Sequence, residues 1–277
     1  HMTDTHIQPE KGASDGVAAC LQHIAAQKDC PDLILTGGDL IMDSFAEPAP
    51  RAEALWKLWT QTFKDHCPIP VEHTLGNHDI FGWNKAESKT TGTEPNWGKK
   101  WAMDVLGLSK PYRSFDRKGW HFIVLDSVRT NGGDGYFAKL EDEQMEWLKG
   151  DLAAVPAGTP VLVCSHIPIL TLTVLGREQL NKEDKLDLSP GAQHVDCYDL
   201  HTLFRDSGKV KLVLSGHIHR LDDCTMDGVR YICDGAVSGA WWDGKKNRCD
   251  EGYGLIDLNS DGSVQHQYTT YGWKARG

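Results

Sequence analysis

The sequence predicts one α/β domain in which mixed sheets pack face to face and helices lie outside them. Two observations support this prediction. Short apolar runs rich in β-branched residues alternate with stretches of helical spacing, and no internal repeat, low-complexity tract or linker composition divides the 277 residues. The composition, 40% apolar and 25% charged, is typical of a globular protein with a sizeable core. We expect the single domain to span residues 3–277.

The first half of the chain is expected to contain two helices, each followed by a strand. The first helix, within residues 14–28, has a cap at Ser14 or Asp15 and then helical spacing of its apolar residues. The elements that follow are a strand at 32–39, a helix at 51–63 and a strand at 69–75. Residues 82–118 are polar and rich in Trp, Lys and Gly, so we interpret them as an insertion or substrate-cap loop with one helix near 98–107.

The second half is expected to be richer in strands. Strands are predicted at 120–127, 160–166, 209–219, 229–235, 252–258 and 263–271, and helices at 141–153 and 196–206, with a long loop at 168–195. The eight cysteines form no C-x-x-C pair. Cys224 and Cys233 flank a hairpin turn, and either a disulfide between them or two free thiols is compatible with that spacing.

Composition also excludes some classes of partner. No apolar run approaches the ~20 residues that a membrane span needs. The formal net charge of −10 argues against a general nucleic-acid surface, which calls for a basic face. A phosphate-bearing substrate is still compatible with this charge, because a bound metal ion reverses the local field.

Polar side chains end five separate apolar runs or turns. They are Asp4 and His6, then Asp39, then Asn77, His78 and Asp79, then His166, and finally His217 and His219. Taken singly, each has an ordinary explanation as a turn residue or a satisfied polar group. Taken together they favour a site, because ligands of open α/β sheets bind beyond the carboxyl ends of the strands.

The residue types indicate a metal centre. Imidazole, carboxylate and amide oxygen together suit Mn, Fe or Zn better than an all-thiolate site would. Seven such donors are too many for one tetrahedral zinc and about right for two ions that share a bridging carboxylate. Two ions about 3.5–4 Å apart suit in-line displacement at phosphorus.

The ordered set of motifs resembles the calcineurin-like metallophosphoesterase superfamily over nearly the whole chain. The motifs are Asp4-Thr5-His6, Gly38-Asp39, Gly76-Asn77-His78-Asp79, His166 and Gly216-His217-Ile218-His219. The fold that this resemblance implies is a four-layer α/β/β/α sandwich of two mixed sheets, with a dinuclear site at the strand ends.

The resemblance also implies a role for each residue. Asp4, His6 and His219 would hold one metal ion, and Asn77, His166 and His217 the other, with Asp39 as the bridge. His78 would contact phosphate and protonate the leaving alkoxide after attack by a metal-bridging hydroxide. Asp79 would orient His78 by accepting a hydrogen bond from its second nitrogen.

The subfamily motifs favour diesters. A tyrosine ligand of purple acid phosphatases would stand where this chain has Met42, and Ser/Thr protein phosphatases have Glu in place of Asp79. The motif "GNHD", with "KPYRSFDRKGWHFIVLDS" and "EQMEWL", is more similar to bacterial class III cyclic nucleotide phosphodiesterases and glycerophosphodiesterases. We expect a phosphodiesterase acting on a small-molecule ester. A phosphomonoesterase or nucleotidase, and a weakly active binding or scaffold module, are the alternatives.

The start of the sequence leads to further expectations. His1-Met2 reads as a cloning scar, or Met2 as a native start. Because only three residues precede Asp4, the first strand of the resembled fold would be truncated, and we expect Asp4–His6 to fray and the first metal site to be weak. A cytoplasmic location is favoured, with removal of an export signal as the alternative. The oligomeric state stays open, and a homodimer is one candidate.

Tryptophans in the variable loops have two interpretations. Trp83, Trp97 and Trp101 lie in the insertion, and Trp241 and Trp242 follow the strand at 229–235. They either stack on a nucleobase or pin down long loops, and the second interpretation is favoured.

Overall fold

The computed structural model describes residues 1–175, 187–246 and 248–276. The helices are α1 (Ala13–Ala25), α2 (Ala49–His66), the 3-10 turn η1 (Asn77–Asp79), α3 (Lys85–Ser88), α4 (Lys100–Leu106), α5 (Asp142–Ala154) and α6 (Cys197–Ser207). The strands are β1 (Ile34–Thr36), β2 (Val71–His73), β3 (Arg113–Arg117), β4 (Trp120–Val124), β5 (Val128–Thr130), β6 (Tyr136–Ala138), β7 (Val161–Cys164), β8 (Val210–Ser215), β9 (Asp222–Met226), β10 (Val229–Cys233), β11 (Gly252–Leu258) and β12 (Val264–Thr270).

The larger sheet has six strands in the order β3-β4-β7-β8-β10-β9. Its four inner strands are parallel, and the two edge strands run antiparallel to their neighbours. Successive residues of an inner strand face opposite sides. In β7, for example, Val163 packs with the residues of α5 and α6, whereas Leu162 faces the second sheet.

The second sheet is assembled from shorter pieces. β1 pairs with β2 in parallel, and β11 pairs with β12 in antiparallel. The first two residues join these pairs. The Met2 amide donates to the Leu35 carbonyl at 3.0 Å, while the Gly254 amide donates to the His1 carbonyl at 2.9 Å.

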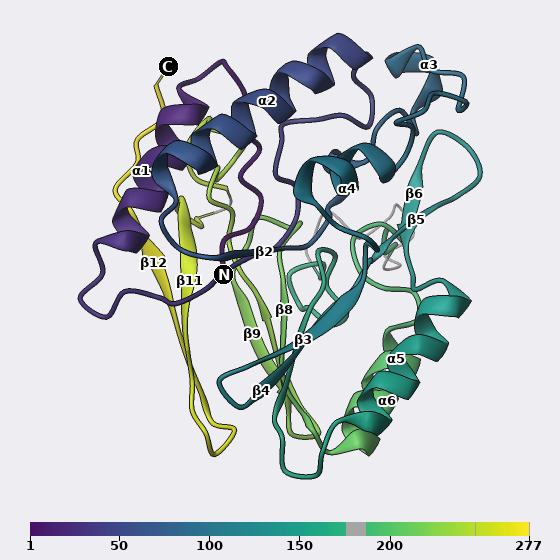
Figure 1. The fold of residues 1–277 in the computed structure, drawn as a ribbon, viewed down its shortest axis with the longest axis vertical. Coiled ribbons are helices and arrows are strands. Elements are labelled where there is room, and N and C mark those ends of the chain that lie inside the picture. Colours follow the sequence, from purple (N-terminus) through teal and green to yellow (C-terminus); the bar gives the residue numbers. More distant parts are fainter. Residues whose placement is uncertain (176–186, 247, 277) are drawn as a thin grey trace.

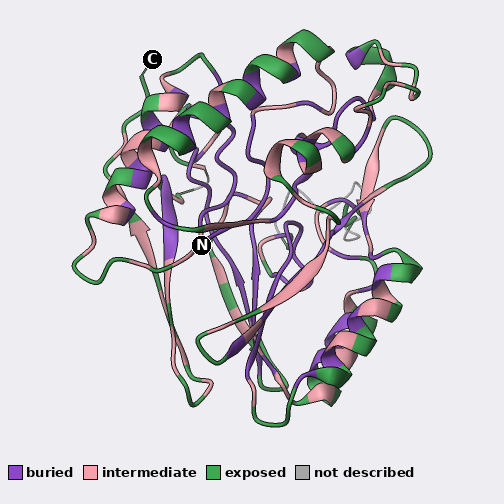
Figure 2. Ribbon diagram, viewed as in Figure 1, coloured by how far each residue is buried: buried purple, intermediate pink, exposed green. Residues whose placement is uncertain are grey.

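Helices and sheets are stacked in layers (Figure 1), and three apolar clusters fill the spaces between the four layers. One cluster lies between α1, α2 and the second sheet, and a second lies between the two sheets. The third lies under α5 and α6. Figure 2 shows the inner strands as mostly buried and the outer faces of the helices as exposed. The predicted four-layer α/β/β/α fold is confirmed.

The expectation that Asp4–His6 frays is wrong for this structure. Both side chains are fully buried. The Asp4 amide donates to the Gly38 carbonyl and the His6 amide to the Asp39 carbonyl, each at 3.0 Å. The segment runs along the residues that follow β1, and their carbonyls hold it in place. A longer upstream strand is therefore not needed to anchor it. This anchoring removes our reason for expecting a weak first metal site.

The tryptophans of the insertion are structural. Trp97 donates its indole N–H to the Gly82 carbonyl at 3.0 Å, and the Trp101 ring meets Phe81 edge-on at 4.8 Å. Trp83 is 8% exposed. These contacts agree with the pinned-loop interpretation. The predicted long loop at 168–195 falls partly on residues 176–186, which lie outside the described residues.

The structure also bears on the cysteines and on the expected absence of a membrane span. Cys224 lies opposite Tyr231 in the β9–β10 hairpin, and all eight cysteines are free thiols, so the disulfide alternative is wrong. Among the described residues, no helix is both long enough and apolar enough to cross a bilayer.

Candidate metal centre

Residues from five separate segments meet where the strands of both sheets end. Among the described residues, the possible His, Cys, Asp and Glu ligand atoms form three groups, and within each group all atoms lie within 4.8 Å of one another. The groups are Asp4, His6 and His219; His6, Asp39 and His78; and Asp39, His166 and His217. These groups contain seven of the nine residues that the sequence pattern selected, all but Asn77 and Asp79.

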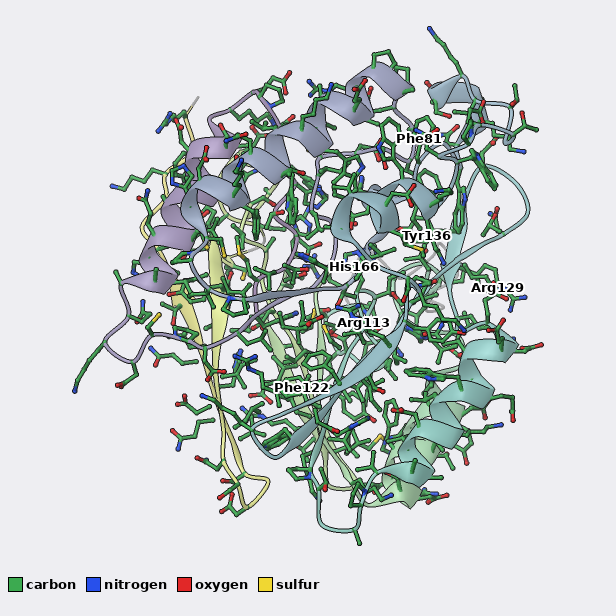
Figure 3. All side chains as sticks on the ribbon, in the orientation of Figure 1. Phe81, Arg113, Phe122, Arg129, Tyr136 and His166 are labelled. Carbon is green, nitrogen blue, oxygen red and sulfur yellow. The ribbon has the colours of Figure 1, made fainter. Side chains whose placement is uncertain are left out.

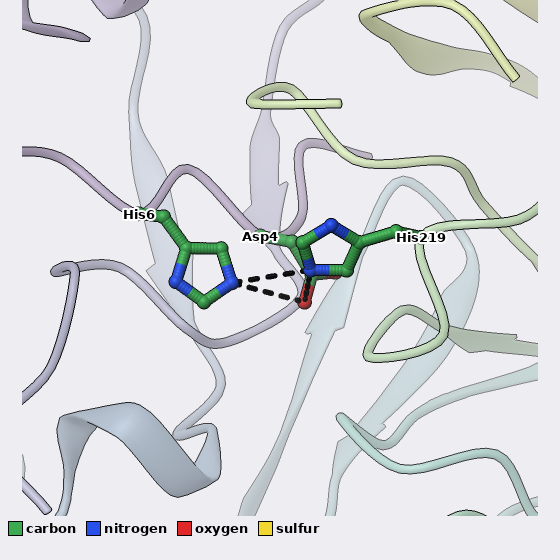
Figure 4. A group of neighbouring side chains, drawn as sticks. All are labelled: Asp4, His6 and His219. Atoms are coloured by element: carbon green, nitrogen blue, oxygen red, sulfur yellow. Dashed lines mark hydrogen bonds and ion pairs between the residues drawn. The ribbon is translucent and has the colours of Figure 1, made fainter. Parts of the chain in front are cut away.

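The first set combines the N-terminal segment with the turn after β8 (Figure 4). Asp4 Oδ1 lies 3.3 Å from His219 Nε2, and the Nε2 atoms of His6 and His219 are 3.1 Å apart. The other Asp4 oxygen accepts the Thr3 hydroxyl at 2.6 Å and the His217 amide at 2.9 Å. These two bonds leave Oδ1 facing the histidines.

The second set is centred on Asp39. Its Oδ2 lies 3.2 Å from His166 Nε2 and 3.6 Å from His6 Nε2, so this carboxylate touches both sets. His166 Nε2 is also 3.2 Å from Asn77 Oδ1 and 3.2 Å from His217 Nδ1. Asp39 therefore occupies the position expected of a bridging ligand.

The backbone at the site is held in an uncommon conformation. Asp4, His6, Asp39, His217 and His219 all have positive φ, between 40° and 68°. L-residues with a side chain rarely adopt this region, and strain of this kind concentrates at functional sites. Each of these residues leaves its segment in a tight turn, which directs the side chain into the common space.

Glycine permits the closest approach between two of these turns. A Cβ added to Gly76 would lie 2.1 Å from Asp39 Oδ1 and 2.2 Å from the Asp39 amide nitrogen. The turn that carries Asn77 and His78 can therefore pack directly against Asp39 only because residue 76 has no side chain.

Hydrogen bonds fix the orientation of two histidine rings. His166 Nδ1 donates to the Gly37 carbonyl at 2.7 Å, and His219 Nδ1 donates to the Gly239 carbonyl at 2.5 Å. A carbonyl can only accept, so Nε2 of each neutral ring is left as a lone pair facing the site. This is the tautomer that a metal ligand requires.

The donor set fits bound cations. Asp4 Oδ1 is buried and has no hydrogen-bond partner among the described residues. The Nε2 lone pair of His219 points at His6 Nε2 across 3.1 Å. Buried acceptors that face one another in this way are unfavourable unless a proton or a cation lies among them.

The electrostatics of the pocket support the same conclusion. Burial lowers the pKa of His6 to about 3, and burial together with the charge of His166 lowers that of His217 to about 3. Burial alone would raise the pKa of Asp39, but the charges of His166 and His78 hold it well below its usual range. At neutral pH His6 and His217 are therefore neutral beside the ionised Asp39. Burial alone would lower the pKa of His166, but the charge of Asp39 outweighs it and raises the pKa to about 9, so binding of a metal ion at His166 would release a proton.

His78 is partly exposed to solvent, unlike several of its neighbours in the site. Its side chain is 30% exposed, whereas those of His6 and His166 are fully buried. Its Nδ1 donates to Asp43 Oδ1 at 3.0 Å, which leaves Nε2 free. Burial alone would lower the pKa of His78, but the charge of Asp39 and the bond to Asp43 outweigh it and raise the pKa to about 9.

The expected bond between Asp79 and His78 is wrong for this structure. Asp79 Oδ1 accepts the Leu40 amide at 2.8 Å, and Oδ2 accepts the Gly76 amide at 2.8 Å. The η1 turn directs Asp79 into the protein while His78 faces outward. Burial and the nearby charge of Asp39 raise the pKa of Asp79 to about 7. Asp79 therefore ties the η1 turn to the segment after β1.

Asp43 is the partner that the sequence analysis missed. It lies four residues after Asp39 in a loop, and its two oxygens also accept the Phe45 and Ala46 amides at 2.9 and 3.1 Å. The only available signal was a second acidic residue shortly after the glycine-aspartate motif. Such a residue is common in turns, so it did not stand out.

We predict different consequences for Asp43→Asn and Asp79→Asn. The first removes the charge beside His78 and should lower turnover about 10- to 100-fold with little loss of stability. The second places an amide N–H against a backbone N–H in the interior and should lower the free energy of unfolding by about 1–3 kcal/mol. Steady-state kinetics and denaturant unfolding of both variants test this pair, and the opposite pattern would restore Asp79 as the partner of His78.

We also predict that metal ions stabilise the protein. Mn²⁺ at 100 times its dissociation constant should add about 2.7 kcal/mol per site to the free energy of unfolding, because only the folded chain assembles the ligands. The increase in Tm, measured by differential scanning calorimetry, should disappear on addition of a chelator. A Tm that is insensitive to Mn²⁺, Zn²⁺ and Fe²⁺ alike would contradict this expectation.

Comparison with known proteins gives matches over most of the chain. The family model described as calcineurin-like phosphoesterase matches residues 1–221. A 3′,5′-cyclic-nucleotide phosphodiesterase of Nostoc sp. is 30% identical over 241 residues, which cover 83% of this chain and 74% of that protein. The 3′,5′-cyclic adenosine monophosphate phosphodiesterase CpdA of Escherichia coli is 25% identical over 281 residues, which cover 95% of this chain and 86% of that protein.

Solved structures show the same fold. A dimetal phosphatase from Danio rerio superposes with a TM-score of 0.58 at 15% identity, covering 84% of this chain and 86% of that chain. A purple acid phosphatase from yellow lupin superposes with a TM-score of 0.63 at 15% identity, covering 98% of this chain and 50% of that chain.

Proposed function

The chain belongs to the calcineurin-like phosphoesterase family and is a metal-dependent phosphoric ester hydrolase, and we propose that it hydrolyses phosphate diesters at a two-metal site. Cyclic nucleotides are the first substrate class to test, because the relatives from Nostoc and Escherichia coli carry cyclic-nucleotide phosphodiesterase names. The observation that carries the proposal is that three ligand groups adjoin one another, two of them sharing Asp39, with the partly exposed His78 among them.

The residues divide into two candidate ligand sets. Asp4, His6 and His219 would hold one ion, and Asn77, His166 and His217 the other, with Asp39 shared between them. Two bound ions would stabilise the negative charge on the phosphate oxygens and lower the pKa of a water molecule that attacks phosphorus. The nitrogen- and oxygen-rich donor set suits Mn, Fe or Zn.

His78 would act as the general acid. Its Nδ1 is held by Asp43 at 3.0 Å, so Nε2 is the atom that can carry a proton to the leaving oxygen. A raised pKa keeps the ring protonated before the reaction, as an acid requires. Asp43 would act through His78 by fixing its ring and stabilising its positive charge.

The buried ligands make the site rigid. Asp4, His6 and His166 are fully buried, and their segments are joined by hydrogen bonds that hold the acceptors in place without substrate. A preorganised polar site of this kind does not have to reorient as charge develops in the transition state. Such preorganisation favours a catalytic centre over a binding module, because only a catalytic centre has to stabilise a transition state.

The first experiment compares bis-p-nitrophenyl phosphate with p-nitrophenyl phosphate, with added Mn²⁺ and with a chelator control. Chelator-sensitive turnover that favours the diester supports the proposal, and a panel of 3′,5′-cyclic nucleotides then identifies the substrate. Preference for the monoester would move the assignment to a phosphatase or nucleotidase. No turnover of either ester with metal bound would favour the binding or scaffold alternative.

A further inference from the structure

We propose that Trp241 and Tyr136 form two side walls of the substrate site, Trp241 for the leaving alcohol and Tyr136 for the alcohol that stays on phosphorus. This inference rests on the proposed diesterase function and deepens it. It favours diesters with a separate planar or apolar group on each side of the phosphate over 3′,5′-cyclic nucleotides, in which one ribose carries both ester oxygens. A monoester would use one wall only.

Trp241 lies against the first ligand set. Its ring centroid is 4.7 Å from that of His219, with the planes tilted by 39°, and 6.1 Å from that of His6. Unlike Trp242, which is fully buried and donates to the His6 carbonyl, Trp241 keeps part of its surface exposed. The two neighbouring tryptophans therefore serve different ends, one as core and one at the mouth of the site.

The backbone holds Trp241 in this place under strain. Its φ is 52° and that of Trp242 is 74°, so two consecutive bulky residues occupy the left-handed region. Strain of this kind persists only where the surrounding structure imposes it, and it concentrates at sites that bind ligands. The buried Trp242 supplies the anchor, because its ring fills the space next to Gly16.

Lys246 covers part of the Trp241 ring. Its ammonium lies 4.4 Å from the ring centroid. A cation–π contact between two partly exposed side chains is weak, so a planar substrate group can displace the Lys246 side chain.

Tyr136 lies against His217 of the second ligand set; Figure 3 labels Tyr136 and His166, another residue of that set. Its ring meets His217 edge-on at 6.3 Å and Phe45 edge-on at 5.7 Å. Within the described residues its hydroxyl has no hydrogen-bond partner, so a donor beside the site is left for the substrate.

The position of His78 decides which wall meets the leaving group. The His78 ring meets His6 edge-on at 4.9 Å, and His6 is also the neighbour of Trp241. The alcohol that His78 protonates therefore departs on the Trp241 side. The retained alcohol is directed toward His217 and Tyr136.

Three esters with the same leaving group test the two roles: bis-p-nitrophenyl phosphate, methyl p-nitrophenyl phosphate and p-nitrophenyl phosphate. Tyr136→Leu should lower kcat/KM for the bis ester about threefold to tenfold and leave the other two nearly unchanged, because only the bis ester retains an aromatic group. Trp241→Leu should lower kcat/KM for all three by a similar factor, because all three release nitrophenol.

Matched controls separate these effects from loss of structure. Phe137→Leu alters the neighbouring residue of β6, and Trp97→Leu alters a tryptophan of the insertion; neither should change the ratios among the three esters. Tyr136→Phe and Trp241→Phe keep an aromatic ring if the leucine variants fail to fold, and should retain most of the discrimination. As a second readout, quenching of tryptophan fluorescence by the bis ester should be smaller in Trp241→Phe than in the wild type.

The outcomes distinguish the two levels of the proposal. Equal losses on all three esters in Tyr136→Leu, or full activity in Trp241→Leu, would overturn the inference about the walls while the diesterase function stands. A wild type that hydrolyses none of the three esters with Mn²⁺ would overturn the proposed function and this inference with it.

Discussion

Replacing Asp39 by asparagine is expected to lower diester turnover by about 10³-fold or more, the largest effect of any single substitution at this site. Partners that only support a metal ligand already contribute 10- to 100-fold, and Asp39 touches both ligand sets directly. Asparagine has the same shape but one acceptor oxygen and no charge, so it cannot bridge two cations. Steady-state kinetics with saturating Mn²⁺ measure the loss.

Metal content separates this explanation from general damage. Asp39→Asn should bind fewer than two Mn²⁺ ions by isothermal titration calorimetry and should keep the circular dichroism spectrum of the wild type. Thr225→Asn, at an exposed position in β9, serves as a control that should bind metal normally. Two tightly bound ions in Asp39→Asn would contradict the bridging role.

Replacing His78 by asparagine is expected to lower kcat by about 10²- to 10⁴-fold while metal binding is retained. His78 contributes its amide to Asp39 through a 2.8 Å hydrogen bond, and asparagine preserves that backbone bond. The substitution therefore removes the proton donor without removing a ligand of the two expected sets. Calorimetric titration with Mn²⁺ and steady-state kinetics on the same preparation test both parts.

The leaving group gives a sharper test of the acid role. An alkyl alkoxide needs a proton as it departs, whereas p-nitrophenolate is stable without one. The loss in His78→Asn should therefore be larger for an alkyl diester or a 3′,5′-cyclic nucleotide than for bis-p-nitrophenyl phosphate. Equal losses on all of these substrates would assign His78 to phosphate binding and not to proton transfer.

The ligand set and the layer order could be read from the sequence because both depend on local patterns. Five of the seven expected ligands, all but Asp4 and His6, follow an apolar run or a glycine turn, and parallel strands deliver such ends to one edge of a sheet. Alternation of apolar residues in the strands and helical spacing between them predict two covered sheets. These signals lie within short stretches, so no knowledge of distant contacts is needed to find them.

The partner of His78 was decided only by the tertiary structure. Asp79 is its neighbour in sequence, but the η1 turn directs that carboxylate to the Leu40 and Gly76 amides instead. Asp43 comes from another loop and reaches His78 because the two turns pack against each other. Adjacent residues of a tight turn point in different directions, and the turn geometry is not visible in the motif.

The tertiary structure also decided whether the first residues are well ordered and which role each tryptophan has. Residues 1–7 are held by hydrogen bonds to segments 34–42 and 254, which sequence length alone could not reveal. Trp241 and Trp242 are the same residue type side by side, yet one is buried and the other borders the metal centre. The sequence by itself determined the fold class and the donor set, because periodicity and strand-end position are local. The three-dimensional packing alone decided which side chain each donor faces, because that depends on how distant turns meet.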